Sequence, residues 1–260
     1  MLKPILFNTE MVVAIQAGRK TVTRRLIRRD RNDVIKMACA KGKNFGPFPE
    51  NEPLPEQLMT WYMTNYPKRP CEVGDVLWVR ETWDFIPCVT CGLPCASSPK
   101  EIGKTQFCIR PDQMETADGL TDGCFLYRAE GETPVFSNGH RWRPSIHMPR
   151  QAARIFLRVK AVYPDRLQES VNVSPRPIKE IEAEGIPIDE ECQECVKTYG
   201  WPCCIDEESE CGLLDDQRGK FADLWDSTIP KKRLDKQGWA ADPWVWVIRF
   251  ERCEEPKECK

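Results

Sequence analysis

Apolar and polar residues alternate in several short segments of the chain, and this period of two predicts β-strands. We expect strands over residues 3–7, 21–27, 76–80, 125–129, 154–162 and 244–250. The last segment has the clearest pattern, because Trp246, Ile248 and Phe250 occupy alternate positions between smaller or charged residues. Such an alternation is typical of a strand that buries one face.

Helices are indicated where apolar residues recur at three- and four-residue spacing between recognisable end signals. Asn8 or Thr9 can cap the first helix, and Gly18 can end it, because a left-handed C-cap costs little only for glycine. Two further helices are expected between residues 174 and 185 and around residues 221–225. These helices are few compared with the strands, which is typical of a small β-barrel with peripheral helices.

Three stretches interrupt the predicted elements, and we interpret them as insertions into one α+β domain that spans residues 1–260. They lie at about residues 38–70, 86–124 and 187–216. The first is rich in proline, glycine and aromatic residues and is expected to be a long loop packed on the barrel. A chain of 260 residues buries enough apolar surface to fold without disulfides.

Charge is distributed unevenly along the chain, although its net charge is only −2. Cations gather between residues 19 and 36, and acids gather between residues 189 and 216. A basic stripe on a near-neutral protein suggests contact with a polyanion. We therefore expect Arg24, Arg28 and Arg29 to contact the phosphates of RNA or DNA, and the alternative is a merely solvated basic face.

The sequence contains no apolar run of the length that a signal peptide or a membrane span requires. We expect no membrane partner and a cytoplasmic location, where thiols stay reduced. The fourteen cysteines then need an explanation other than disulfides.

Most of the cysteines form two clusters inside polar insertions, and each cluster contains a Cys-x2-Cys step. That step places two sulfurs on one tetrahedral ion, so we predict structural zinc. Alternatives are free buried thiols, one zinc site shared by both clusters, or an iron–sulfur cluster. The proposed ligands are Cys88, Cys91, Cys95 and Cys108 in the first cluster, and Cys192, Cys195, Cys203, Cys204 and Cys211 in the second.

Candidate chemistry lies just after the turn at Gly18. Lys20 occupies the junction between helix and strand, and Thr23 and Arg25 share one face of the strand by alternation. An amine within reach of a hydroxyl can act as base to that nucleophile. The alternative is an amphipathic edge strand with solvated cations.

The spacing Gly18-x-Lys20-x4-Arg25 resembles the GxKxxxxR signature of the ASCH family, whose members are small barrels similar to the PUA RNA-binding fold. Further segments resemble the longer, phage-type members in the same order along the chain. These are residues 74–83, 142–150, 183–186 and 243–248. The resemblance does not extend to the cysteine-rich insertions.

Some small ASCH proteins are amidohydrolases that remove the acetyl group from N4-acetylcytidine, and their catalytic set maps onto this chain. The resemblance implies that Lys20 is the base, Thr23 the nucleophile and Glu184 the general acid, with Arg25 holding an oxyanion or a phosphate. Other residues are expected to bind the substrate. They are Gly18, Trp78, Arg80, Trp142, Ser145 and His147.

Three functions are therefore compatible with the sequence. The first is hydrolysis of an N-acylated nucleoside, without an organic cofactor. The second is non-catalytic binding of RNA or a modified nucleic acid in the same cleft, and the third is an accessory or assembly role in a phage, in the host cytoplasm. Ser145 and His147 as a nucleophile and its base are a weaker alternative, because no acid is fixed to orient the imidazole.

Overall fold

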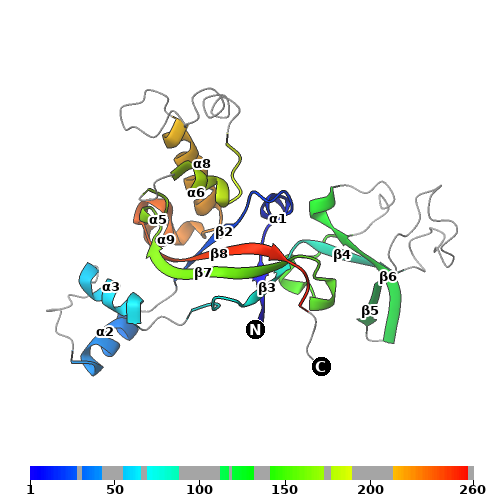
Figure 1. Cartoon of the computed structure of the whole chain (residues 1–260), viewed down its shortest axis with the longest axis horizontal. Helices are drawn as coiled ribbons and strands as arrows, with labels where there is room; N and C mark the ends of the chain where they lie inside the picture. Colours follow the sequence, from blue (N-terminus) through cyan, green and yellow to red (C-terminus); the bar gives the residue numbers. More distant parts are fainter. Residues whose placement is uncertain are drawn as a thin grey trace. The chain divides into compact units, whose positions relative to one another are not determined.

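A computed structural model of the chain describes residues 1–27, 31–42, 55–65, 69–87, 112–116, 119–131, 141–172, 177–188 and 213–256. Within these ranges, eight β-strands and seven α-helices are present (Figure 1). The α+β class predicted from the sequence is therefore confirmed.

The described strands form two sheets. The larger is mixed, in the order β1-β3-β7-β8-β2, with β1 parallel to β3 and the pairs β3–β7 and β2–β8 antiparallel. The smaller is antiparallel, in the order β4-β6-β5. The strands are β1 (Leu2–Leu6), β2 (Val22–Leu26), β3 (Val76–Arg80), β4 (Trp83–Pro87), β5 (Asp112–Thr116), β6 (Gly119–Tyr127), β7 (Phe156–Arg166) and β8 (Trp244–Cys253).

These pairings do not close the larger sheet into a barrel over the described part of the chain. The closed PUA-like barrel expected from the sequence is thus not confirmed, and what the structure has in its place is a five-stranded mixed sheet.

The chain divides into two compact units. The first comprises Met1–Gly18, Asp75–Arg158 and Arg252–Lys260, and the second comprises Arg19–Gly74 and Val159–Glu251. The single domain expected from the sequence stays a prediction.

In the first unit, helix α1 (Thr9–Gln16) begins where the sequence predicts it, because the side chain of Asn8 accepts a hydrogen bond from the backbone N–H of Met11 at 2.8 Å. Gly18 follows the helix with a φ of 74°, the left-handed conformation expected there. One apolar cluster of this unit is formed by Trp83, Phe85, Phe125, Met148 and Ala152.

In the second unit, helices α6 (Pro177–Ala183) and α8 (Leu213–Ser227) lie side by side and share one apolar core with β2 and β8. The core residues include Val22, Ile181, Phe221 and Val247. Two short helices, α5 (Glu169–Asn172) and α9 (Leu234–Gln237), also belong to this unit.

The expected long loop at residues 38–70 is partly helical. Helices α2 (Arg31–Ala40) and α3 (Glu56–Asn65) bury Val34, Ala38, Leu58 and Tyr62 in a separate apolar cluster. Residues four apart lie on one face of a helix, and this burial explains why the segments fold as helices. None of the described helices combines the length and the apolar character that crossing a membrane requires.

Candidate functional site

The candidate site lies in the second unit, where β2 meets the end of α6. The backbone N–H of Thr21 donates to the carbonyl of Ala183 at 2.9 Å, which ties the start of the strand to the end of the helix. In the β2–β8 register, Val22 pairs with Arg249 and Arg24 with Val247. These four side chains therefore share one face of the sheet, the face that α6 and α8 cover.

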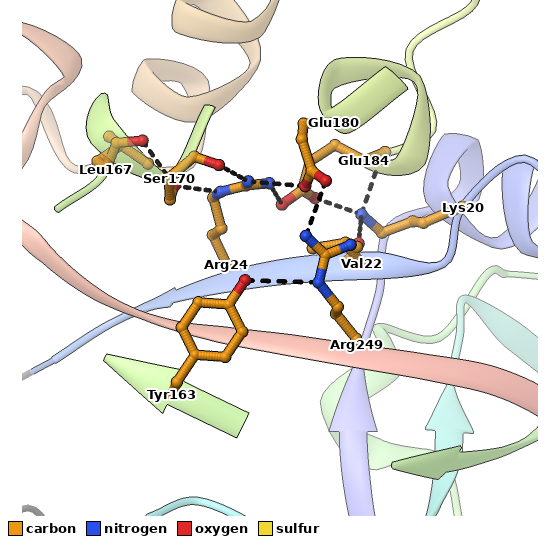
Figure 2. Close-up of polar contacts among 9 residues, drawn as sticks. All are labelled: Lys20, Val22, Arg24, Tyr163, Leu167, Ser170, Glu180, Glu184 and Arg249. Atoms are coloured by element: carbon orange, nitrogen blue, oxygen red, sulfur yellow. Dashed lines mark hydrogen bonds and ion pairs between the residues drawn. The ribbon is translucent and has the colours of Figure 1, made fainter. Parts of the chain in front are cut away.

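Lys20 is the most deeply buried cation of the site, and its side chain is 0% exposed. Its ammonium donates to the carbonyl of Val22 at 2.8 Å, the carbonyl of Glu184 at 2.7 Å and Oε2 of Glu184 at 2.6 Å (Figure 2). An ammonium has three N–H donors, so these acceptors match its full donor capacity.

Arg24 holds the other oxygen of the same carboxylate. Its NH1 group donates to Oε1 of Glu184 at 2.8 Å, and its Nε and NH2 groups donate to the hydroxyl and the carbonyl of Ser170 at 2.6 and 2.8 Å. We call these three groups, Lys20, Arg24 and Glu184, the buried ion cluster. The side chain of Glu184 is only 5% exposed, so two cations face one carboxylate away from water.

A second carboxylate lies outside the buried ion cluster. Glu180 accepts from Arg249 at 2.7 Å and, at 3.5 Å, from Arg24, and Arg249 also reaches the hydroxyl of Tyr163 at 3.4 Å (Figure 2). The side chain of Arg249 is 38% exposed. The network thus runs from a dry interior to a partly solvated edge.

Burial and charge act in opposite directions on these groups. Burial lowers the pKa of Lys20, and the charge of Glu184 offsets this only in part. Burial alone would raise the pKa of Glu184, but the charges of Lys20 and Arg24 outweigh it and hold that pKa below its ordinary value. The resting cluster is therefore an ammonium and a guanidinium paired with a carboxylate.

The predicted catalytic residues come together in part. Lys20 and Glu184 are in direct contact although 164 residues separate them. Thr23 is buried and, by alternation, lies with Arg25 on the opposite face of β2 from Arg24. The Val22 carbonyl that binds Lys20 belongs to the peptide unit leading into Thr23.

Burial also lowers the pKa of Arg25, and the charge of Glu184 opposes this effect. That Lys20, Thr23, Arg25 and Glu184 line one concave pocket stays a prediction.

The predicted substrate-binding residues other than Arg25 lie in the first unit. Trp78 is buried in an apolar cluster, while Trp142 is half-buried and His147 is exposed. Arg80 packs its guanidinium 5.4 Å from the centre of the Trp78 ring and donates to the carbonyls of Ile146 and Met148. It thereby anchors the turn η4 (Ser145–His147).

The predicted phosphate contacts are placed differently from the expectation. Arg24 was expected on an exposed basic stripe, yet it is buried, because Glu184 and Ser170 satisfy its guanidinium. Arg28 and Arg29 lie outside the described residues.

The proposed zinc ligands also lie outside the described residues, both in the first cysteine cluster and in the second. Within the described ranges, no group of three or more histidine, cysteine, aspartate or glutamate side chains is placed to hold a metal ion.

Several members of the network were not predicted from the sequence. Glu180 precedes Glu184 by four residues, a spacing that places both carboxylates on one side of a helical turn and that could have indicated it. Arg249 interrupts the apolar run of β8 and was also a usable signal. Ser170 and Tyr163 carry no such signal, because they enter the site only through tertiary packing.

We compared the chain with models of known protein families, with curated proteins and with solved structures, and none of them matches. The ASCH resemblance therefore stays a prediction from the motifs.

Proposed function

We propose that the chain is an amidohydrolase that removes the acyl group from an N-acylated nucleobase similar to N4-acetylcytidine. The observation that carries this proposal is the contact between Lys20 and Glu184, at 2.6 Å. Those two residues were selected by motif alone, from segments 164 residues apart. In the proposed reaction Lys20 takes the proton of Thr23 and Glu184 protonates the leaving nitrogen, so the two residues must lie at the same site.

The buried ion cluster supports this chemistry because it is one proton away from an acid and a base. Transfer of a proton from Lys20 Nζ to Glu184 Oε2 gives a neutral amine beside a neutral carboxylic acid. Burial lowers the pKa of Lys20 and so favours its neutral form. The same transfer leaves the buried guanidinium of Arg24 without its carboxylate partner, so the neutral pair is a minor state of the cluster.

In the proposed reaction, the Lys20 amine takes the proton of the Thr23 hydroxyl while Thr23 Oγ attacks the acyl carbon. Arg25, on the same face of β2 as Thr23, faces the developing oxyanion. Glu184 then gives its proton to the leaving nitrogen as the C–N bond breaks. Water hydrolyses the threonyl ester, giving one of its protons to Thr23 Oγ and releasing the carboxylic acid. The cluster returns to its resting ion pair.

A second function, binding of a nucleoside or RNA without catalysis, is favoured by one specific observation. Arg24 donates to Glu184 at 2.8 Å and so stabilises the carboxylate rather than the carboxylic acid. A purely structural ion cluster would show the same contact. The two functions differ in turnover, which a direct assay measures.

The first prediction is that the purified full chain converts N4-acetylcytidine or another N-acylated cytidine to cytidine. Chromatography of the reaction mixture measures the cytidine that is formed. Thr23→Val keeps the volume of this buried side chain and removes only its hydroxyl, so we expect the rate to fall more than about 100-fold. Thr23→Ser, which keeps a hydroxyl, should retain part of the activity.

The matched control is Thr21→Val, the same change at an exposed position two residues earlier in the chain. It should leave the rate within about twofold of wild type, because that hydroxyl has no part in the mechanism. Equal turnover by Thr23→Val and wild type would refute the assignment of Thr23 as the nucleophile. Binding of the nucleoside without turnover in wild type would establish the second function instead.

A further inference from the structure

Four exposed cations gather on the segment that follows helix α8 in the second unit. Two short elements carry them, the 3-10 turn η6 (Lys231–Arg233) and helix α9. Residues 231–236 contain one acid, Asp235, against these cations. We call the four cations the basic turn, and they are Lys231, Lys232, Arg233 and Lys236, all of them exposed.

The basic turn makes no ion pair within the described part of the chain. Two other exposed lysines of the same unit do pair. The ammonium of Lys160 lies 3.1 Å from a carboxylate oxygen of Glu251, and that of Lys220 lies 3.6 Å from one of Asp216. Cations that are close together repel one another unless an anion compensates them. The basic turn therefore gains electrostatic energy from an anionic partner.

The dipole of helix α8 does not account for these cations. The helix ends at Ser227, and its last turn carries no basic residue. The negative end of a helix acts on charges within its last turn, whereas the basic turn begins at Lys231, a full turn farther along the chain. The cations are thus not explained as a complement to the helix that precedes them.

Hydrogen bonds fix the backbone beneath the basic turn. The indole N–H of Trp225, on α8, donates to the carbonyl of Gln237 at 2.8 Å. The backbone N–H of Trp239 donates to Oδ1 of Asp226 at 2.7 Å. Gly238, between them, is buried, and a Cβ atom there would lie 2.6 Å from a backbone oxygen. A backbone held in this way presents its cations with little further ordering when a partner binds.

The chemistry of the basic turn favours the phosphates of a nucleic acid over the surface of a membrane. Three of its cations are lysines, which are flexible point charges and can follow a row of phosphates. Binding to a lipid surface gains strength from apolar side chains that enter the headgroup region. No large hydrophobic residue of the described segment 228–242 is exposed. Those that are exposed in the described chain are Met1, Leu6, Val13, Val73 and Ile146.

We propose that the basic turn binds the phosphate backbone of a nucleic acid. This contact is independent of the hydrolysis proposed above, because Thr23 and Arg25 lie on the opposite face of β2 from the core that α8 helps to form. It carries no sequence information of its own, since the phosphates are the same at every base.

The experiment titrates the full chain into a fluorescein-labelled oligouridine and follows the fluorescence anisotropy. The double variant Lys231→Gln with Lys232→Gln should bind at least about tenfold more weakly than wild type at low salt. Each phosphate contact of a single strand adds about 0.7 to the slope of log affinity against log salt, so this slope should become shallower by about 1.4. The melting temperature should not change, because both side chains are exposed.

Lys160→Gln with Lys220→Gln is the matched control, because it removes the same charge from two exposed lysines of the same unit. Its affinity should stay within about twofold of wild type. Equal weakening by the control would overturn the proposal, because net charge alone would then explain the binding. Arg233→Gln with Lys236→Gln repeats the test on the other half of the basic turn, and it replaces the first double variant if that one fails to fold.

A wild type that binds no oligouridine would also overturn the proposal. Binding to phosphatidylserine vesicles without binding to oligouridine would assign the basic turn to a membrane instead.

These outcomes are separable from those of the hydrolysis assay, because N4-acetylcytidine carries no phosphate. Its turnover should be the same in the double variants of the basic turn as in wild type. Turnover without any binding of oligouridine refutes this inference alone. Binding that depends on the basic turn, without turnover by wild type, refutes the hydrolase alone.

Discussion

At the scale of single residues, Glu184 is the group on which two buried cations depend. Its replacement by glutamine removes the charge that compensates both Lys20 and Arg24. Breaking a buried pair by removing one partner typically costs about 3–5 kcal/mol, because a charge remains buried and unpaired. We therefore expect Glu184→Gln to lower the free energy of unfolding by about that amount, measured by urea denaturation.

The control for this variant is Glu72→Gln, which breaks the exposed pair between Glu72 and Arg69. The Glu72 side chain is 57% exposed, and we expect a loss below about 1 kcal/mol. If Glu184→Gln also lowered the free energy of unfolding by less than about 1 kcal/mol, the charges of Lys20 and Arg24 would have to be compensated by water or by a rearrangement of the site.

The same residue predicts how stability depends on pH. The pKa of Glu184 is held below its ordinary value of 4.5 in the folded protein. The ionised carboxylate therefore makes its full contribution to the free energy of unfolding at any pH above 4.5. The contribution is lost as the pH falls through the lowered pKa. The difference in stability between wild type and Glu184→Gln should therefore stay constant from about pH 7 to about pH 5 and shrink as the pH falls below about 4.5. A constant difference would contradict the assignment.

At the scale of elements, Arg80 on β3 fixes the turn η4 by donating to the carbonyl of Ile146 within the turn and to that of Met148, which directly follows it. We expect Arg80→Met to loosen that turn and leave the strand intact, because methionine fills a similar space without donors. Hydrogen exchange at the amides of His147 and Met148 should accelerate by about tenfold, since two bonds to a charged group are lost.

Lys160→Met serves as the control for the turn, because the pair between Lys160 and Glu251 is more than half exposed on both sides. It should not alter exchange in η4. Unchanged exchange in Arg80→Met would mean that the prolines flanking the turn hold it without the arginine.

Elements with strong local signals could be predicted from the sequence. Strand β3 was predicted with its observed bounds, and α1 with its observed cap, because alternation and a capping side chain are local properties. Helices α2 and α3 were missed, since prolines and glycines around them indicated a loop. The bounds of β6 and β7 were shifted by several residues, because pairing with neighbours decides where a strand ends.

The site was predictable to a different extent. The Lys20–Glu184 contact followed from a motif, whereas the burial of Arg24 did not, because the sequence alone shows a run of cations and not their partners. Ser170 was equally hidden, since its contribution depends on where α5 packs.

At the scale of the whole molecule, the cysteine clusters predict that the protein carries metal. We expect roughly one or two zinc ions per chain, measured by elemental analysis of protein prepared without chelators. Cys192→Ser combined with Cys195→Ser should lower the zinc content, because it removes one Cys-x2-Cys step. Cys39→Ser, an exposed cysteine on α2 outside both clusters, should leave the content unchanged. Protein without metal would rule out the zinc hypothesis.

The contact between Lys20 and Glu184 also has a consequence for how the protein folds. A bond between residues 164 positions apart forms only after a long segment of chain has closed on itself, and contacts of this kind lower the rate of folding. Helix α6 and strand β2 each have local signals of their own, but neither can complete the ion cluster alone. The chemistry proposed here thus depends on a late, non-local step, and a nascent chain cannot acquire it until α6 has been synthesised.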